Sequence, residues 1–163
     1  MHLAKEGMAV GIYMEAFHHF VWATRKREHL ITAETECVLH RYIRQRCGGF
    51  RVAVHALNSM PDHVHLVVTL PATLAPADFM ETIKGASAHF VNHLPEMEGC
   101  LYWQAGYGWL TFALDDLPRI ARYVDRQKER HDAGRLSVKM ERAADWEASP
   151  QSREAGVPGV RAG

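Results

Sequence analysis

The sequence has 163 residues, of which 47% are hydrophobic, and its 19 basic side chains balance 19 acidic ones. This length predicts one domain with a genuine core, and the balanced charge excludes a protein whose whole surface is positive. No apolar run is long enough to cross a bilayer, and the first residues lack the layout of a signal peptide. The three cysteines form no CxxC pair. We therefore expect a cytoplasmic protein without a disulfide framework.

The first half of the chain alternates between strand and helix patterns. The aromatic and apolar residues of 13–24 predict the first strand. Residues 32–46 have helical spacing, with a threonine to cap the first turn and a pair of glycines after the last. Residues 50–58 and 63–70 alternate as two strands, and the turn between them predicts an antiparallel pair.

The second half continues with a helix of about five turns, judged by its apolar periodicity, that opens at Pro76. Residues 102–114 predict a last strand, bent around Gly106 and Gly108. A further helix is expected over residues 118–131, and the stretch 137–146 is expected to form a short terminal helix.

The order β-α-β-β-α-β, followed by one extra helix, is typical of an α+β protein with the ferredoxin-like split βαβ arrangement. In this fold two helices cover one face of an antiparallel sheet and leave the other face free. We expect a leader over residues 1–12, one catalytic domain over 13–135 and a tail over 136–163. The end of that tail is rich in serine, proline, glycine and charge, and is expected to be disordered.

The strand that follows Pro61-Asp62 carries two histidines, His63 and His65. Because side chains alternate along a strand, both imidazoles point to the same face. Such a pair can hold one divalent cation. The spacing alone is equally compatible with two polar residues on the exposed face of an ordinary strand. Asp62, just before the pair, either orients a histidine or caps the turn, and the turn role is the simpler interpretation.

The last predicted helix carries Tyr123 and Gln127, four residues apart and therefore on one face. An isolated tyrosine there would be expected in the core, whereas a glutamine beside it is unusual on a buried face. A stripe of arginines also repeats at this spacing: Arg122, Arg126 and Arg130. It can neutralise phosphates, or it can form a solvated helix face paired with nearby acidic residues.

The segment 102–109 combines four aromatic residues with two glycines. Aromatic rings can stack on unpaired bases in single-stranded nucleic acid, or they can fill the core beside the sheet. The basic cluster at the end of the first strand is the triplet Arg25, Lys26 and Arg27. By itself it is compatible with a solvated surface.

In order along the chain, these motifs resemble the single-tyrosine HUH transposases of the insertion sequence 200/605 group, within the superfamily of REP-associated tyrosine transposases. The resemblance extends over most of residues 13–131. It rests on five blocks: the basic cluster at 24–28, Met-Pro-Asp-His-Val-His-Leu at 60–66, Ile-Lys-Gly-Ala-Ser at 83–87, Trp-Gln-Ala-Gly-Tyr-Gly at 103–108, and Tyr-Val-Asp-Arg-Gln at 123–127. After His131 the sequence departs from the family pattern.

The resemblance implies a role for each of four residues. His63 and His65 would be the HUH histidines, and Gln127 would be the third protein ligand of Mg²⁺ or Mn²⁺. Tyr123 would be the nucleophile that forms a 5′-phosphotyrosine. The family needs no nucleotide hydrolysis, and the sequence contains no GxxxxGK[ST] phosphate-binding loop. Candidate DNA contacts are Arg25, Lys26, Arg27, Lys84, Arg122, Arg126 and Arg130.

The implied substrate is single-stranded DNA with imperfect hairpins at the ends of a mobile element, which the family cuts and rejoins. Family members are dimers in which the tyrosine helix of one subunit can complete the active site of the other, so a homodimer is expected here. Three alternatives remain. They are a relative that processes chromosomal palindromes, a catalytically silent or domesticated DNA- or RNA-hairpin-binding regulator, and an unrelated metal hydrolase that uses water as nucleophile.

Overall fold

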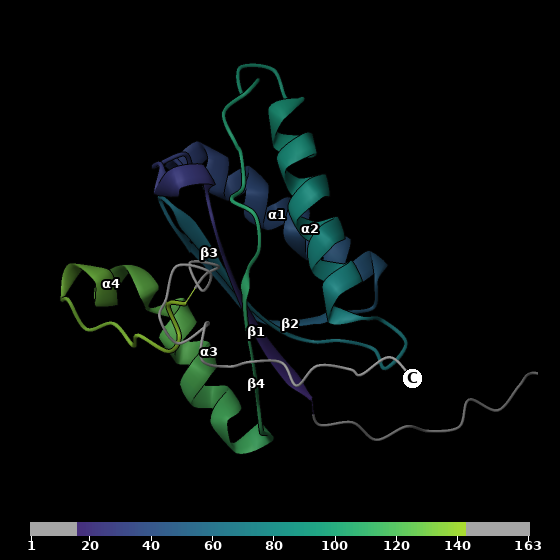
Figure 1. The fold of residues 1–163 in the computed structure, drawn as a ribbon, viewed down its shortest axis with the longest axis vertical. Helices are drawn as coiled ribbons and strands as arrows, with labels where there is room; N and C mark the ends of the chain where they lie inside the picture. Colours follow the sequence, from purple (N-terminus) through teal and green to yellow (C-terminus); the bar gives the residue numbers. More distant parts are fainter. Residues whose placement is uncertain (1–15, 143–163) are drawn as a thin grey trace, which may run out of the picture.

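The computed structural model describes residues 16–142 and consists of a four-stranded antiparallel sheet with helices on both faces (Figure 1). The strands are β1 (Phe17–Ala23), β2 (Ala53–Met60), β3 (His63–Thr69) and β4 (Gly108–Phe112), in the order β2-β3-β1-β4. This is the predicted ferredoxin-like α+β arrangement. The predicted leader and most of the predicted tail lie outside the described residues.

Two long helices cover one face of the sheet, α1 (Ala33–Gly49) and α2 (Pro76–Asn92). The side-chain oxygen of Thr32 accepts a hydrogen bond from the backbone of Thr35, so α1 has the predicted N-cap. The main core lies between these helices and the sheet. Strand residues such as Phe20 and Leu66 are fully buried there, against Phe79 of α2 among others.

The opposite face of the sheet is covered by α3 (Leu117–Asp125), α4 (Gln127–Asp132) and the segment that follows them. A second, smaller cluster packs Ile120 and Val124 of α3 with Met140 against Ala56 and Val67 of the sheet. A side chain on this face can therefore be buried although it points away from the main core. None of the helices within residues 16–142 is both long and apolar enough to cross a membrane.

The predicted helix over 118–131 is wrong in one respect, because it is two helices that meet at Arg126. The side-chain amide of Asn58, on β2, donates hydrogen bonds to the backbone carbonyls of Val124 and Asp125, at 2.9 and 3.1 Å. Arg126 then leaves helical geometry, with φ of −97° and ψ of 22°. Because these carbonyls accept hydrogen bonds from Asn58, the run of helical backbone hydrogen bonds ends there and a new helix begins at Gln127.

Two further predictions need correction. The expected strand over 102–114 is paired with β1 only from Gly108 to Phe112. Before it the chain is an irregular loop, because Gly106 takes a positive φ of 74° that no regular strand allows. The described part of the expected helix over 137–146 is a single turn, in which the carbonyl of Ser137 accepts from the backbone of Met140 and Glu141.

Three of the connections in the described chain are short turns. A 3₁₀ turn, η1 (Arg25–Arg27), follows β1, and another, η2 (Leu114–Asp116), leads from β4 into α3. Between β2 and β3 the chain reverses at Pro61 and Asp62. This turn is tied to the end of β1, because the backbone of Thr24 donates to the carbonyl of Asp62 at 2.8 Å.

Candidate active site

His63 and His65 lie on the face of β3 that α3 covers, and both are buried, with 2% and 0% of their surface exposed. Their ring centroids are 5.0 Å apart. The alternative of an ordinary exposed strand face is therefore wrong. Two buried imidazoles on one face need either polar partners or a cation.

Each histidine is oriented by a different residue on its far nitrogen. Nδ1 of His63 lies 2.6 Å from Oδ1 of Asp62, and Nδ1 of His65 lies 3.0 Å from Nε2 of His19 on β1. With both Nδ1 atoms engaged, the two Nε2 atoms turn toward a common point. Partners of this kind fix the tautomer and the ring direction of metal-binding histidines. Asp62 therefore orients His63, beyond its place in the turn.

Tyr123 and Gln127 approach the same point from α3 and α4. Their side chains are buried, at 5% and 0% exposure, and they share a face despite the break at Arg126. The hydrogen bonds from Asn58 to the end of α3 attach this helix to the strand that neighbours β3. The four predicted catalytic and metal-ligating residues thus come together within one chain.

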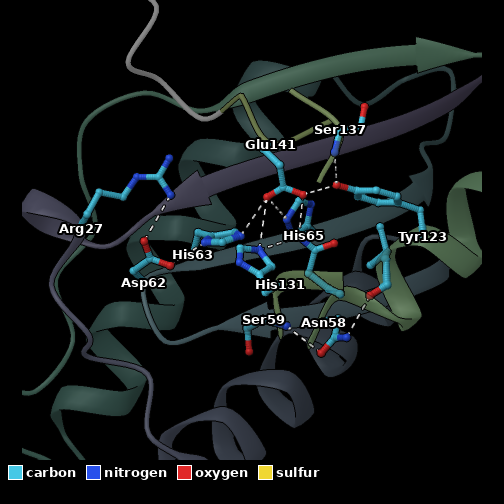
Figure 2. Close-up of polar contacts among 12 residues, drawn as sticks. Arg27, Asn58, Ser59, Asp62, His63, His65, Tyr123, His131, Ser137 and Glu141 are labelled. Carbon is cyan, nitrogen blue, oxygen red and sulfur yellow. Dashed lines mark hydrogen bonds and ion pairs between the residues drawn. The ribbon is translucent and has the colours of Figure 1, made fainter. Parts of the chain in front are cut away.

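Glu141 occupies the point on which these side chains converge (Figure 2). Its Oε2 lies 3.3 Å from Nε2 of His63 and 3.4 Å from Nε2 of His65. Its Oε1 accepts hydrogen bonds from the Tyr123 hydroxyl and from the Gln127 amide, the latter at 2.6 Å. His63, His65 and Glu141 each offer a donor atom, and these atoms lie within 4.8 Å of one another.

Two residues near this centre add contacts to it. Nε2 of His131, on α4, lies 3.6 Å from Oε2 of Glu141 and 3.0 Å from the Gln127 amide nitrogen. The backbone N–H of Ser137 donates to the Tyr123 hydroxyl oxygen at 3.0 Å. In Figure 2 the Tyr123 ring and His63 lie on opposite sides of the Glu141 carboxylate. The nucleophile candidate and the histidines are therefore bridged by one carboxylate.

The electrostatics of the centre keep the proton on the tyrosine. Burial and then the hydrogen bond to Glu141 raise the pKa of Tyr123 to about 12. Burial acts to raise the pKa of Glu141, but contacts with His63 and His65 outweigh it and hold that pKa well below its ordinary value. Burial acts to lower the pKa of His63, whereas Asp62 and Glu141 raise it overall. Burial lowers the pKa of His65.

The predicted basic residues after β1 lie in the 3₁₀ turn η1 at the end of that strand. Arg25 stacks over the Tyr102 ring at 4.7 Å, and Arg27 forms an ion pair with Asp62 at 3.4 Å. Lys26 is exposed in the 3₁₀ turn. Tyr102 remains 42% exposed. Arg25 and Tyr102 therefore form an accessible stacked pair, of a kind that can bind unpaired bases.

The other predicted DNA contacts fall into two groups. Lys84 is half-buried, and its ammonium group donates to the carbonyls of Gln104, at 2.8 Å, and Gly106, at 2.5 Å, so it anchors the loop before β4. Arg122, on α3, and Arg126, at the break between α3 and α4, are exposed. Arg130 instead places its guanidinium 4.7 Å above the Tyr123 ring. The predicted stripe is thus split by the break between α3 and α4.

Sequence reasoning did not include His19 or Glu141. His19 lies in a strand of aromatic and apolar residues and no short motif marks it. Glu141 lies in the stretch where the pattern fades, and its distance from the histidines in sequence hides the contact. A signal did exist for His19, because it shares a strand face with apolar neighbours, and a histidine at such a position needs a polar partner.

Comparisons with known proteins agree with the fold. A solved structure of a transposase from Deinococcus radiodurans R1 superposes with a TM-score of 0.57, at 26% identity, over 73% of this chain and 95% of that one. The model of the family described as IS200-like transposases matches residues 13–127. The chain therefore belongs to the IS200-like transposase family, whose members bind and move DNA.

Two further relatives are similar in sequence or fold. The ISDra2 transposase TnpA of Deinococcus radiodurans is 27% identical over 126 residues, which are 74% of this chain and 89% of that protein. A REP-associated tyrosine transposase, solved bound to a REP hairpin, superposes with a TM-score of 0.55 at 17% identity, over 78% of this chain and 74% of that one. This last likeness is one of fold.

Proposed function

We propose that this protein cuts and rejoins single-stranded DNA through a covalent bond to Tyr123, with the help of a divalent cation held by His63, His65 and Gln127. The observation that carries the proposal is the convergence of all four side chains on one point, which Glu141 occupies. A hydroxyl nucleophile beside a cation site is the arrangement that phosphoryl transfer requires.

The donor atoms fit a cation such as Mg²⁺ or Mn²⁺. Among the described residues, Nε2 of His63, Nε2 of His65 and Oε1 of Gln127 are buried and have no hydrogen-bond partner. The contacts of the histidines with Glu141 have the distance of ion pairs without hydrogen-bond geometry. Two imidazoles with amide and carboxylate oxygens are a mixed donor set, unlike the Cys- and His-based sites that hold structural zinc.

The reaction begins with the Tyr123 hydroxyl. Its oxygen bonds to the phosphorus while the bond from phosphorus to the 3′ oxygen breaks, and the electron pair of that bond leaves with the 3′ oxygen. Glu141 accepts the hydrogen bond of this hydroxyl and orients its oxygen. The proton leaves Tyr123 as the bond to phosphorus forms, and the departing 3′ oxygen takes up a proton to become a hydroxyl. A bound cation would withdraw charge from the phosphate. The product is a 5′-phosphotyrosine and a free 3′ hydroxyl, and a second 3′ end can reverse the step.

The arrangement of the site also bears on the expected dimer. Tyr123 and both histidines meet within a single chain, so a second copy is not needed to bring them together. We propose that this cis arrangement is one functional state. The homodimer remains a prediction from the family resemblance, and size-exclusion chromatography with light scattering would measure it.

The test is incubation with labelled single-stranded DNA that carries the hairpins flanking the gene, with Mg²⁺ or Mn²⁺. We expect a protein–DNA adduct that survives denaturation and disappears in Tyr123→Phe. Tyr42→Phe is the matched control, because Tyr42 lies on α1, on the other face of the sheet, where its ring stacks on Phe90. Binding of Mn²⁺ alone, followed by electron paramagnetic resonance, should weaken in His63→Ala and stay unchanged in Tyr42→Phe.

Each other outcome would support a different function or contradict the cation site. Tight hairpin binding without an adduct, under either metal, would support the silent regulator. Cleavage that persists in Tyr123→Phe would indicate a nuclease that uses water. Mn²⁺ binding that is equal in wild type and His63→Ala would contradict the proposed cation site whatever the activity.

A further inference from the structure

A basic cavity lies beside Tyr123, formed by α3, α4 and the segment after them. It has a volume of about 450 Å³, and three of the seven residues that line it are arginines. Its lining is Arg119, Tyr123, Arg130, Arg135, Leu136, Ser137 and Met140. None of these residues is acidic. The cavity therefore concentrates positive charge next to the proposed nucleophile, in a protein whose net charge is zero.

The three arginines differ in how much of their charge is already used. Arg119 donates to the Asp116 carboxylate at 2.8 Å, so it is partly neutralised. Arg130 lies over the Tyr123 ring at 4.7 Å, and its buried Nε has no hydrogen-bond partner within residues 16–142. The exposed side chain of Arg135 forms no ion pair in the part of the chain that the structure describes. Arg130 and Arg135 therefore have guanidinium groups to offer an anion.

A backbone hydrogen bond links these two residues. The N–H of Arg135 donates to the carbonyl of Arg130 at 2.9 Å, which closes the turn after α4. A second cavity of about 230 Å³ adjoins the first and shares Arg119, Ser137 and Met140 with it. Lys139 lines that second cavity. Asp116, the acidic residue in its lining, is bound to Arg119. The positive surface thus continues past Tyr123 toward β4.

Tyr123 separates this cavity from the histidines. Its hydroxyl points to Glu141 and the cation site, while its ring faces the Arg130 guanidinium. A DNA strand with one phosphate at the Tyr123 hydroxyl must place a neighbouring phosphate within reach of one side of the Tyr123 ring. Arginine binds phosphate oxygens through paired N–H donors. A cavity lined by arginines and by no carboxylate therefore suits a phosphodiester.

We propose that Arg130 and Arg135, with Arg119 at the rim, bind a backbone phosphate of single-stranded DNA adjacent to the phosphate that Tyr123 attacks. The inference rests on the proposed function, because it takes the attacked phosphate as its reference point. It gives Arg119 and Arg135, which lie outside the sequence-predicted contacts, a place in substrate binding, and it gives Arg130 a defined phosphate partner.

The first measurement is the salt dependence of binding to a labelled single strand, in chelator so that no reaction occurs. Each phosphate contact to a single strand contributes about 0.7 to the slope of log K against log salt. We expect Arg135→Ala to reduce the magnitude of this negative slope by about 0.7. Arg135→Lys should keep the slope of the wild type. The matched control is Arg41→Ala, an exposed arginine of α1 on the other side of the sheet, which should leave the slope unchanged.

The second measurement locates the phosphate. Single phosphates near the cleavage position are replaced one at a time by uncharged methylphosphonates. At one position the methylphosphonate should weaken binding of the wild type and weaken binding of Arg135→Ala by less, because one partner of that phosphate is already missing. Equal slopes in Arg135→Ala and Arg41→Ala, or additive losses at every position, would overturn the proposal.

The outcomes also separate this inference from the proposed function. If wild type forms the Tyr123 adduct while Arg135→Ala keeps the wild-type slope, the arginine subsite is refuted and the transfer reaction stands. If Arg135→Ala lowers the slope but wild type forms no adduct, the cavity binds DNA and the tyrosine reaction fails. In that case the methylphosphonate position would still identify the phosphate that the arginines contact.

Discussion

Replacing His19 with glutamine should make the folded protein less sensitive to acid. His19 is 1% exposed, and its Nε2 lies 3.0 Å from Nδ1 of His65. Burial, and then the neighbouring His65, lowers the pKa of His19 from 6.5 to about 3. A glutamine side-chain oxygen at this position can still accept a hydrogen bond from His65. The variant therefore removes the titrating group and preserves the contact.

The expected magnitude follows from the two pKa values. Below pH 6.5 the unfolded chain takes up a proton on His19, whereas the folded chain does so only near pH 3. The contribution to stability is therefore complete above the unfolded pKa and is lost as the pH falls. Between about pH 7.5 and about pH 5, the free energy of unfolding should drop by about 2 kcal/mol on account of His19 alone.

The assay is urea unfolding of wild type and His19→Gln at each pH, in chelator so that no cation binds His65. His29→Gln serves as the control, because His29 is exposed. Over this pH range, His19→Gln should lose about 2 kcal/mol less than wild type, with an unchanged urea slope. Parallel stability curves for wild type and His19→Gln would refute the reasoning, since they would mean that His19 is not buried in its neutral form.

Three other perturbations test single contacts. Glu141→Gln should lower the pKa of Tyr123 from about 12, because it removes the carboxylate that holds the phenol proton, and ultraviolet titration against Tyr123→Phe would measure the change. Asn58→Ala should cost about 1–3 kcal/mol in urea unfolding, since two carbonyls at the end of α3 lose their donor, whereas no loss would show that this attachment is unimportant. Lys84→Met should also cost about 1–3 kcal/mol, through its two carbonyl contacts, and a changed salt slope for DNA would reveal an additional phosphate contact.

The sheet and its two long helices could be predicted from sequence because their patterns are local. The short, largely apolar run of β3, which is buried on both faces, and the four-residue spacing of Leu39, Ile43 and Cys47 in α1 follow from how each element packs against its neighbours. The break at Arg126 could not be predicted from a local sequence pattern. It depends on Asn58, which is far away in sequence and competes for the helix carbonyls only after the chain has folded.

In the candidate site, too, some residues could be predicted from local motifs and one could not. His63, His65, Tyr123 and Gln127 lie in short motifs, so resemblance and spacing identify them. Glu141 has no motif and meets the histidines only because the segment after α4 returns to the sheet. The predicted stripe of arginines assumed one continuous helix, and the break at Arg126 separates its members. Arg130 instead lines a cavity and faces Tyr123.

The position of Glu141 has a consequence for the order of events during protein synthesis. The centre draws on β1 through His19, on β3, on both covering helices and finally on Glu141, near the end of the described chain. Domains begin to fold while the ribosome is still adding residues. A nascent chain that stops after β4 has its histidines in place but no nucleophile beside them. The complete centre therefore forms only once Glu141 has left the ribosome, and until then a nascent chain lacks part of its proposed DNA-cutting apparatus.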